Sequence, residues 1–280
     1  MTTDRGSSGL CGGKVQVTPR FFANSRYVTK GAPRSGGIAS VYEALELATN
    51  KSVAIKVFRA SNGIDDVIKE SFRREAHALS ELKHENVVRI LESGLDEETG
   101  EHFIVMEWLQ DDFQTVLNEH ADRQVSWEDY YAKLGRPILS ALAYAHSKSI
   151  VHRDIKPSNI MIGRGGELRV CDFGISKLRN FINPGVTLSH YASMPYAPPE
   201  MDDGSYSYSR DVFGFSAFSV AMFFSGEKLK THADLHNALE SLSVDESVKR
   251  CLRKCLSLEN PAERPANAQV LLSEFDRIQP

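Results

Sequence analysis

The chain carries the segment HRDIKPSN at residues 152–159 and the tripeptide DFG at residues 172–174. Together these segments supply carboxylates, an amide and a lysine within a short length of chain. Phosphoryl transfer needs oxygen ligands for Mg²⁺, positive charge against the transferred phosphate, and a group that orients a hydroxyl nucleophile. The pattern therefore predicts the catalytic loop of a phosphotransferase. The alternative, a charged surface loop, would require both segments to arise by coincidence.

Each polar residue of these segments suits one of those needs. Asp154 is the candidate base for the substrate hydroxyl, and Lys156 is the candidate cation beside the γ-phosphate. Asn159 and Asp172 offer the hard oxygen ligands that Mg²⁺ prefers. The segments resemble the catalytic loop and the metal-binding motif of the protein kinase family. The lysine two residues after Asp154 is similar to that of the family's serine/threonine branch.

An earlier segment, VAIK at residues 53–56, ends in a cation. Its apolar and β-branched composition predicts a buried strand that carries Lys56. A lone strand lysine is more often a solvated edge charge, but apolar residues at helical spacing over 65–82 predict a helix that contains Glu75. This helix resembles the family's αC helix. The resemblance implies a Lys56–Glu75 ion pair and contact of Lys56 with the α- and β-phosphates of ATP.

The family's glycine-rich loop is matched only in part. Residues 34–42, RSGGIASVY, keep the central glycine of the G-x-G-x-x-G-x-V pattern at Gly36, but Arg34 and Ala39 stand at the first and third glycine positions. Glycine matters there because backbone amides must approach phosphates closely. The loop resembles that of bacterial Hanks-type serine/threonine kinases. By itself it is as consistent with a hairpin turn as with a nucleotide clamp.

The run FIVMEWL at residues 103–109 predicts a core strand that leads into a polar turn. It resembles the family's fifth strand and hinge, which makes Met106 the gatekeeper and implies that the backbone of Glu107 and Leu109 binds adenine. The nucleotide-binding residues implied by the resemblance are Arg34, Gly36, Gly37 and Ala39 in the loop, Val41, Ala54 and Met161 against adenine, Asp112 at the ribose, and Lys56, Met106, Glu107 and Leu109.

Beyond the DFG segment, a mixed polar stretch ends in APPE at residues 197–200 and resembles the family's activation segment. In the family, an arginine in the position of Arg153 receives an activation-loop phosphate through charge-assisted hydrogen bonds. Thr187 and Ser189 are the candidate phosphorylation sites, although loop hydroxyls are more often unmodified turn formers. Ser193 stands at the family's hydroxyl position beside the catalytic aspartate, which suits a structural and substrate-positioning role.

Two later segments extend the resemblance toward the end of the chain. DVFGF at residues 211–215 begins an apolar run that is shorter than the roughly 20 residues of a membrane span, and it predicts a helix buried all round. It resembles the family's central helix, whose aspartate, here Asp211, bonds the catalytic-loop backbone. NPAERP at residues 260–265 resembles the late D-P-x-x-R-P segment, which implies an ion pair between Arg264 and Glu200.

Size and composition agree with a two-lobed enzyme. The chain has 280 residues, 41% hydrophobic and 25% charged, near the size at which one core divides in two. Its net charge of −4 offers no basic field for nucleic acid, which is not an expected partner. Its four cysteines form neither a disulfide framework nor a zinc site, and the N-terminal residues hold no apolar signal core. We therefore expect reduced thiols and a cytoplasmic location.

We expect an α+β, bilobal, protein-kinase-like fold over residues 27–276. Residues 1–25, rich in glycine, serine and threonine, are expected to be flexible. The small lobe, 26–107, should hold an antiparallel β-sheet with the αC helix, and the large lobe, 108–280, should be mainly helical. Expected strands cover 27–30, 40–47, 52–59, 87–95 and 102–106, and expected helices cover 113–119 and 126–147, the latter kinked before Pro137.

The resemblance implies an ATP-dependent protein serine/threonine kinase that acts in signalling. It would use Mg²⁺, or Mn²⁺ as an alternative, and would phosphorylate protein substrates and its own activation loop, the latter in trans within a homodimer. Two other classes stay open. Arg34 and Ala39 would suit a pseudokinase that only binds nucleotide. Small-molecule kinases share the fold but typically lack a complete activation segment such as the one that ends at Glu200.

Overall fold

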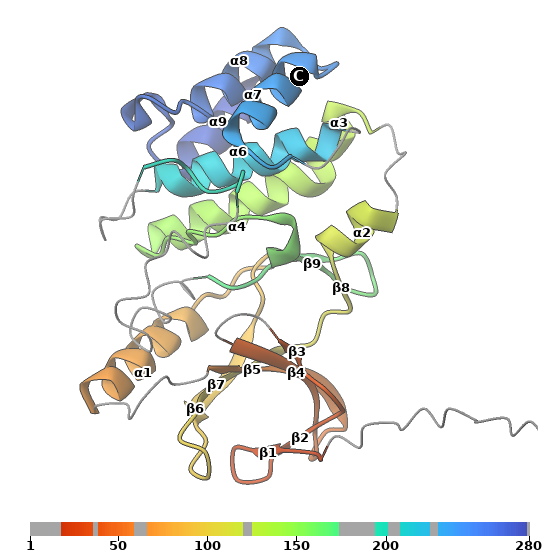
Figure 1. Ribbon diagram of the computed structural model, residues 1–280, viewed down its shortest axis with the longest axis vertical. Coiled ribbons are helices and arrows are strands. Elements are labelled where there is room, and N and C mark those ends of the chain that lie inside the picture. The colour runs from red at the N-terminus through yellow and green to blue at the C-terminus, as the bar shows by residue number, and fades with distance from the viewer. Residues whose placement is uncertain are drawn as a thin grey trace, which may run out of the picture.

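The computed structural model describes residues 18–35, 39–58, 66–119, 125–173, 194–200, 208–224 and 229–278. These residues form a β-sheet lobe with one helix and a larger, mainly helical lobe (Figure 1). The predicted α+β, two-lobed arrangement is confirmed. One boundary differs, because residues 21–22 form strand β1 and pair with β2, whereas residues 1–25 were expected to be flexible. Arg20, just before this strand, forms ion pairs with Asp96 at 2.8 Å and Glu101 at 2.9 Å and so ties it to the rest of the small lobe.

In the described residues, seven antiparallel strands form the sheet of the small lobe, in the order β1-β2-β4-β5-β7-β6, with β3 paired to β4. β5 lies inside the sheet between β4 and β7, which explains why the VAIK segment is apolar. Asn50 takes the left-handed backbone conformation (φ 56°) in the turn between β4 and β5, a conformation that asparagine tolerates. The strands are β1 (Phe21–Phe22), β2 (Tyr27–Thr29), β3 (Arg34–Ser35), β4 (Ala39–Glu46), β5 (Lys51–Phe58), β6 (Ile90–Leu95) and β7 (His102–Glu107).

Helix α1 (Asp66–Ser80) packs against this sheet at its boundary with the large lobe (Figure 1). Phe72 is buried and stacks on the His102 ring of β7, with ring centroids 4.2 Å apart. The segment after the helix is bonded to the large lobe: the Val88 N–H donates to the Val170 carbonyl at 3.0 Å, and the Asn86 side chain donates to the Leu168 carbonyl at 3.1 Å. The chain therefore joins the two lobes here as well as at the hinge.

The regular α-helix is interrupted before Pro137, where a kink was predicted. The expected helix over 126–147 is divided into α3 (Trp127–Tyr130), a π-helical turn η1 (Tyr131–Gly135) and α4 (Arg136–Ser147). In the π turn, the Arg136 N–H donates to the Tyr131 carbonyl, five residues back. Proline has no N–H and its ring crowds the carbonyl four residues before it, so a widened turn ahead of Pro137 relieves the clash.

Helix α6 (Ser209–Phe223) is the centre of the large lobe, and residues 211–220 are all buried, as predicted from the apolar run. A Cβ at Gly214 would lie 3.2 Å from the Ile155 Cβ, so glycine lets α6 approach the loop after His152 closely. Within the described residues, no helix is both long and apolar enough to cross a bilayer. Further helices of this lobe are α2 (Phe113–Glu119), α7 (His232–Ser241), α8 (Glu246–Cys255) and α9 (Ala268–Ile278), with 3-10 turns η2 (Pro157–Asn159) and η4 (Pro261–Glu263).

A small antiparallel sheet at the junction of the lobes was not predicted. It has the order β10-β9-β8 and joins β8 (Asp111–Asp112), β9 (Ile160–Ile162) and β10 (Leu168–Val170) (Figure 1). β8 follows the hinge, β9 follows the HRDIKPSN segment, and β10 precedes the DFG segment. The sheet therefore holds the three segments expected to form the site against one another.

The buried position of α6 yields a stability prediction. We expect Phe218→Ala to lower the free energy of unfolding by about 3–5 kcal/mol, because Phe218 is 0% exposed and its removal leaves a cavity. Phe21→Ala removes the same ring from a position that is 55% exposed, and should change stability by about 0.5 kcal/mol or less. Urea denaturation of both variants measures the difference. Equal losses would contradict the central place of α6.

Candidate active site

A cavity of about 360 Å³ lies between the two lobes, a size that suits a small-molecule ligand. Its walls combine apolar side chains with charged ones, Lys56 and Asp172 among them. It brings together every described residue that was predicted to bind nucleotide except Ala39, which is buried in β4. The lining residues are Lys30, Ala32, Arg34, Val41, Glu43, Ala54, Lys56, Val88, Met106, Glu107, Trp108, Leu109, Asp112, Ser158, Met161, Cys171 and Asp172.

The hinge presents an open hydrogen-bond donor to this cavity. The Glu107 N–H donates to the Arg89 carbonyl at 3.1 Å, so it belongs to the sheet. The described residues provide no acceptor for the Leu109 N–H. Since buried backbone groups are nearly always paired, an N–H left open in a cavity wall favours a ligand with an acceptor there. Asp112 caps α2 by accepting from the Thr115 N–H at 3.0 Å, and it also lines the cavity.

The buried Asp211 of α6 holds the HRDIKPSN segment in place through hydrogen bonds. Its two carboxylate oxygens accept the backbone N–H groups of His152 and Arg153, each at 2.7 Å, as predicted. Burial alone would raise the pKa of Asp211, but the hydrogen bonds from His146 and from the His152 N–H hold that pKa below its usual value. Arg153 has a φ of 71°, a strained backbone that these bonds hold in place.

His146 of α4 sets the hydrogen-bonding pattern around that carboxylate. Its Nδ1 accepts the Ala268 N–H at 3.1 Å, so the proton of the neutral ring lies on Nε2. Nε2–H then donates to the Asp211 carboxylate at 2.9 Å. One imidazole therefore connects α4, α6 and the start of α9 beneath the loop.

His152 connects the two motifs of the site. Its Nε2–H donates to the Cys171 carbonyl at 2.7 Å, and its Nδ1 accepts the Asp154 N–H at 3.2 Å. Its ring also meets the Phe173 ring edge to face, with centroids 4.6 Å apart. The backbone of Asp154 and the backbone next to Asp172 are therefore held by one side chain.

The carboxylate of Asp154 faces two donors from its own loop. Its Oδ2 lies 2.8 Å from the Lys156 Nζ and 3.2 Å from the Asn159 Nδ2. The Asn159 side chain also donates to the Asp154 backbone carbonyl at 2.6 Å. The backbone carbonyl of Asn159 accepts the Cys171 N–H at 2.9 Å. In the described part of the chain, the other oxygen of Asp154, Oδ1, accepts no hydrogen bond. That oxygen is available to an incoming hydroxyl.

Lys56 is buried and forms an ion pair with Asp172 at 2.6 Å. Asp172 has a φ of 66°, a second left-handed non-glycine residue in the site. The predicted partner of Lys56 was Glu75, which lies on α1; that ion pair stays a prediction. The thiol of Cys171 lines the same cavity, and burial next to the charge of Asp172 raises its pKa well above the usual value.

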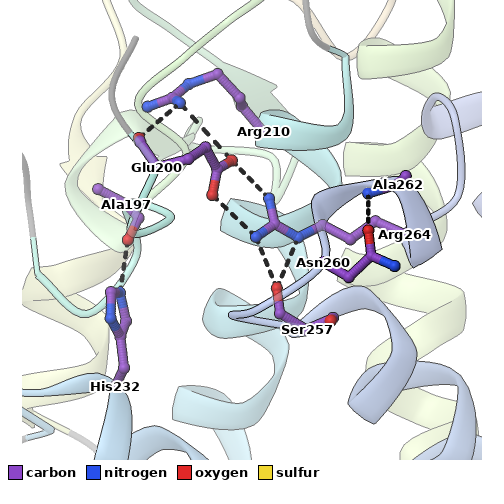
Figure 2. A network of polar contacts seen from close by, with 8 residues as sticks. All are labelled: Ala197, Glu200, Arg210, His232, Ser257, Asn260, Ala262 and Arg264. Carbon is purple, nitrogen blue, oxygen red and sulfur yellow. Dashed lines mark hydrogen bonds and ion pairs between the residues drawn. The ribbon is translucent and has the colours of Figure 1, made fainter.

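The predicted ion pair between Arg264 and Glu200 is present, with N···O distances of 2.7 and 3.0 Å (Figure 2). Arg264 also donates to the Ser257 carbonyl and lies over the Phe213 ring of α6. Burial alone would raise the pKa of Glu200, but Arg264 holds that pKa below its usual value. The end of the APPE segment is therefore anchored to the core of the large lobe.

Two further anchors of the APPE segment were missed by the sequence analysis. Arg210 donates to the Glu200 carbonyl at 3.1 Å, and His232, at the start of α7, donates to the Ala197 carbonyl at 2.7 Å (Figure 2). Both contacts join residues distant in sequence, and neither residue belongs to a motif. Arg264 itself follows turn η4, whose first turn is capped by Asn260 through the Ala262 N–H.

Several predicted residues lie outside the described part of the chain. They are Gly36 and Gly37 of the glycine-rich loop, Gly174 of the DFG segment, and Thr187, Ser189 and Ser193 of the expected activation segment.

Comparisons with known proteins agree with this geometry. A family model described as the protein kinase domain matches residues 34–275. The serine/threonine-protein kinase PksC of Streptomyces coelicolor is 30% identical over 290 residues, which cover 95% of this chain and 51% of PksC. PrkC of Bacillus subtilis is 31% identical over 266 residues, which cover 90% of this chain and 40% of PrkC. The chain thus spans about half the length of these relatives or less.

The fold is also found among solved structures. The crystal structure of the Mycobacterium tuberculosis PknI kinase domain matches with a TM-score of 0.67 and 19% sequence identity, and the match covers 90% of this chain and 96% of that one. At this level of identity the likeness concerns the fold.

The Asp211 contacts generate a prediction that depends on pH. Asp211→Asn leaves one of two buried backbone N–H groups without a good acceptor and should lower the free energy of unfolding by about 1–3 kcal/mol at pH 7. Because the folded-state pKa is lowered, the contribution of the carboxylate is complete above the unfolded pKa, about 3.9, and is lost as pH falls through the folded value. Urea denaturation should therefore show a constant gap from pH 7 to 5 that narrows only below about pH 4. A gap that closes between pH 7 and 5 would contradict this sign.

Two glutamate–arginine pairs allow a matched test of the APPE anchor. Glu200→Ala leaves the Arg264 guanidinium, whose side chain is 0% exposed, without its carboxylate, and should cost about 3 kcal/mol or more. Glu240 makes a similar two-pronged pair with Arg253, but both side chains are more than 40% exposed, so Glu240→Ala should cost about 1 kcal/mol at most. Equilibrium unfolding of both variants checks this. A larger loss at Glu240 would show that the Arg264 anchor contributes little.

Proposed function

The chain belongs to the protein kinase domain family, and we propose that it transfers the γ-phosphoryl group of ATP to serine or threonine hydroxyls of protein substrates. One observation carries this proposal: Asp154, with an open carboxylate oxygen, is linked through Asn159 and the Cys171 backbone to the Lys56–Asp172 pair inside the cavity. A candidate base, oxygen ligands for a metal and a buried cation thus form one connected group.

The cavity suits a purine nucleotide. Its apolar residues suit contact with a flat base. The open Leu109 N–H could donate a hydrogen bond to a ring nitrogen of that base. At the charged end, Asp172 and Asn159 supply oxygen atoms of the kind that Mg²⁺ or Mn²⁺ takes when most of its other ligands are phosphates and water. When bound, Mg-ATP supplies the phosphoryl group that is transferred. The residues present fit this cofactor.

Asp154 is the proposed base and orienting group. Its free Oδ1 can accept the proton of a substrate hydroxyl, while Lys156 and Asn159 hold Oδ2 and fix the direction of the carboxylate. The Lys156 ammonium is also close enough to the carboxylate to place positive charge where the transferred phosphoryl group would lie.

Lys56 is the proposed partner of the α- and β-phosphates, with Glu75 of α1 as the carboxylate that orients it once nucleotide is bound. In the structure, Lys56 is engaged with Asp172 instead. Nucleotide and metal would separate these two charges, because Asp172 is needed as a metal ligand. The proposal therefore requires Lys56 to exchange one carboxylate for another.

Protein is the proposed substrate class. The APPE segment is anchored to the large lobe at Ala197 and Glu200, which would give a protein substrate a fixed surface. We also propose phosphorylation of Thr187 or Ser189, in trans within a homodimer, with Arg153 as the receiver of the phosphate and Ser193 as a substrate-positioning hydroxyl. The kinase unit would comprise residues 27–276, divided at the hinge into 26–107 and 108–280. A cytoplasmic location stays a prediction.

The proposal is tested by replacing the base. Asp154→Asn should lower the phosphorylation rate by a factor of about 100 or more and leave nucleotide binding largely intact. Asp129→Asn changes an exposed aspartate whose carboxylate pairs with Lys133, and this variant should match the parent. Incubation with Mg-ATP, followed by intact and peptide mass spectrometry, measures phosphate on the chain and on a generic basic protein substrate.

Undiminished turnover in Asp154→Asn would contradict the assignment of the base. A parent that binds ATP and transfers no phosphate to itself or to the substrate would favour the pseudokinase class. Transfer to an aminoglycoside or choline, with none to protein, would favour a small-molecule kinase.

A further inference from the structure

The cavity contains a cation that the function proposed above does not use. Arg34 lies on β3, in register with Val41 of β4, and Val41 is in register with Lys56 of β5. Directly opposed residues of antiparallel strands point to the same face of the sheet. Arg34, Val41 and Lys56 therefore form a row across three strands, and all three line the cavity.

The cations that line the cavity differ in whether a carboxylate pairs with them. Lys56 is paired with Asp172 at 2.6 Å, and Lys30, also at the cavity, is paired with Glu43 at 3.1 Å. The Arg34 side chain is exposed, and no hydrogen bond or ion pair joins it to any other described residue. Among the described residues, Arg34 thus brings to the cavity a positive charge that contacts none of the carboxylates in its lining.

The spacing of the strands brings this charge within reach of a phosphate chain. Arg34 and Lys56 lie two strands apart, about 9–10 Å between backbones, with Val41 between them. With the base of a nucleotide beneath Val41 and its phosphates at Lys56, the long Arg34 side chain would reach the phosphates by extending across Val41 toward Lys56. A guanidinium forms paired hydrogen bonds with phosphate oxygens more readily than an ammonium does.

We propose that Arg34 binds the phosphate chain of the nucleotide and makes the cavity select its ligand by charge, with ATP and ADP bound much more tightly than adenosine. Glycine occupies this position in the pattern that the loop resembles, and a glycine has no side chain with which to make such a contact. The assignment rests on the proposed function, because it takes the cavity to be the ATP site.

Nucleotide binding by itself tests this assignment. Calorimetric titration of the full chain with ADP, the ATP analogue AMP-PNP, and adenosine, each with Mg²⁺, should show Arg34→Ala weakening the two phosphorylated ligands about 10-fold or more and adenosine less than about 2-fold. Arg34→Lys, which keeps the charge, should recover part of the loss. Lys51→Ala removes an exposed cation from β5 outside the cavity lining and should match the parent.

Salt provides a second readout. The preference of the parent for ADP over adenosine should fall as the salt concentration rises, and the same preference in Arg34→Ala should depend less on salt. Urea denaturation of each variant shows whether the fold is intact, and β3 has only two residues, so little change is expected.

Three results would overturn the assignment while the proposed function stands: an equal loss for all three ligands, no loss for any, or tighter binding of nucleotide by Arg34→Ala. The first would mean that Arg34 contacts the base or supports the sheet, and the third that it blocks the cavity. A parent that binds none of the ligands would overturn the proposed function, and this assignment with it.

Discussion

The geometry of the site depends on one buried carboxylate. A charge in the protein interior is costly unless donors surround it. Asp211 is surrounded by the backbone N–H groups of His152 and Arg153 and by the ring of His146, and its lowered pKa shows that these donors outweigh burial. This arrangement orients the peptide before Asp154 and holds Arg153 in a backbone conformation that it would otherwise leave. Asp211, in the centre of the large lobe, thus helps to set the orientation of Asp154.

Beyond Asp211, short contacts between loops assemble the rest of the site. His152 joins the Asp154 backbone to the Cys171 carbonyl, Asn159 joins Asp154 to the Cys171 N–H, and the small sheet β8–β9–β10 holds the loops against the hinge. The charged groups within it are paired with one another, Lys56 with Asp172 and Lys156 with Asp154. Under the proposed function, binding of nucleotide and metal would exchange these partners.

Sequence analysis was most successful where a chemical need fixes both residue type and spacing. It predicted the lobes, the buried helix α6, an irregularity of the helix before Pro137, and the contacts of Asp211 and of Arg264 with Glu200. It missed β8, β9 and β10, because strands of two or three residues are too short to show a period. It also missed Arg210, which contacts both the carbonyl and the carboxylate of Glu200, and His232, which donates to the Ala197 carbonyl, because tertiary structure brings these partners together. In this structure Lys56 pairs with Asp172, whose backbone has a φ of 66°. The spacing of residues along the sequence did not predict this partner.

The segment after α1 fixes one point about which the two lobes could rotate. Residues 86–88 precede β6 of the small lobe, but they are bonded to β10 of the large lobe. If the sheet turns relative to the large lobe, the C-terminal end of α1 stays near this fixed point, as at a pivot, and the helix acts as a lever arm. Rotation of the sheet relative to the large lobe would then change where Glu75 lies relative to the residues of β10.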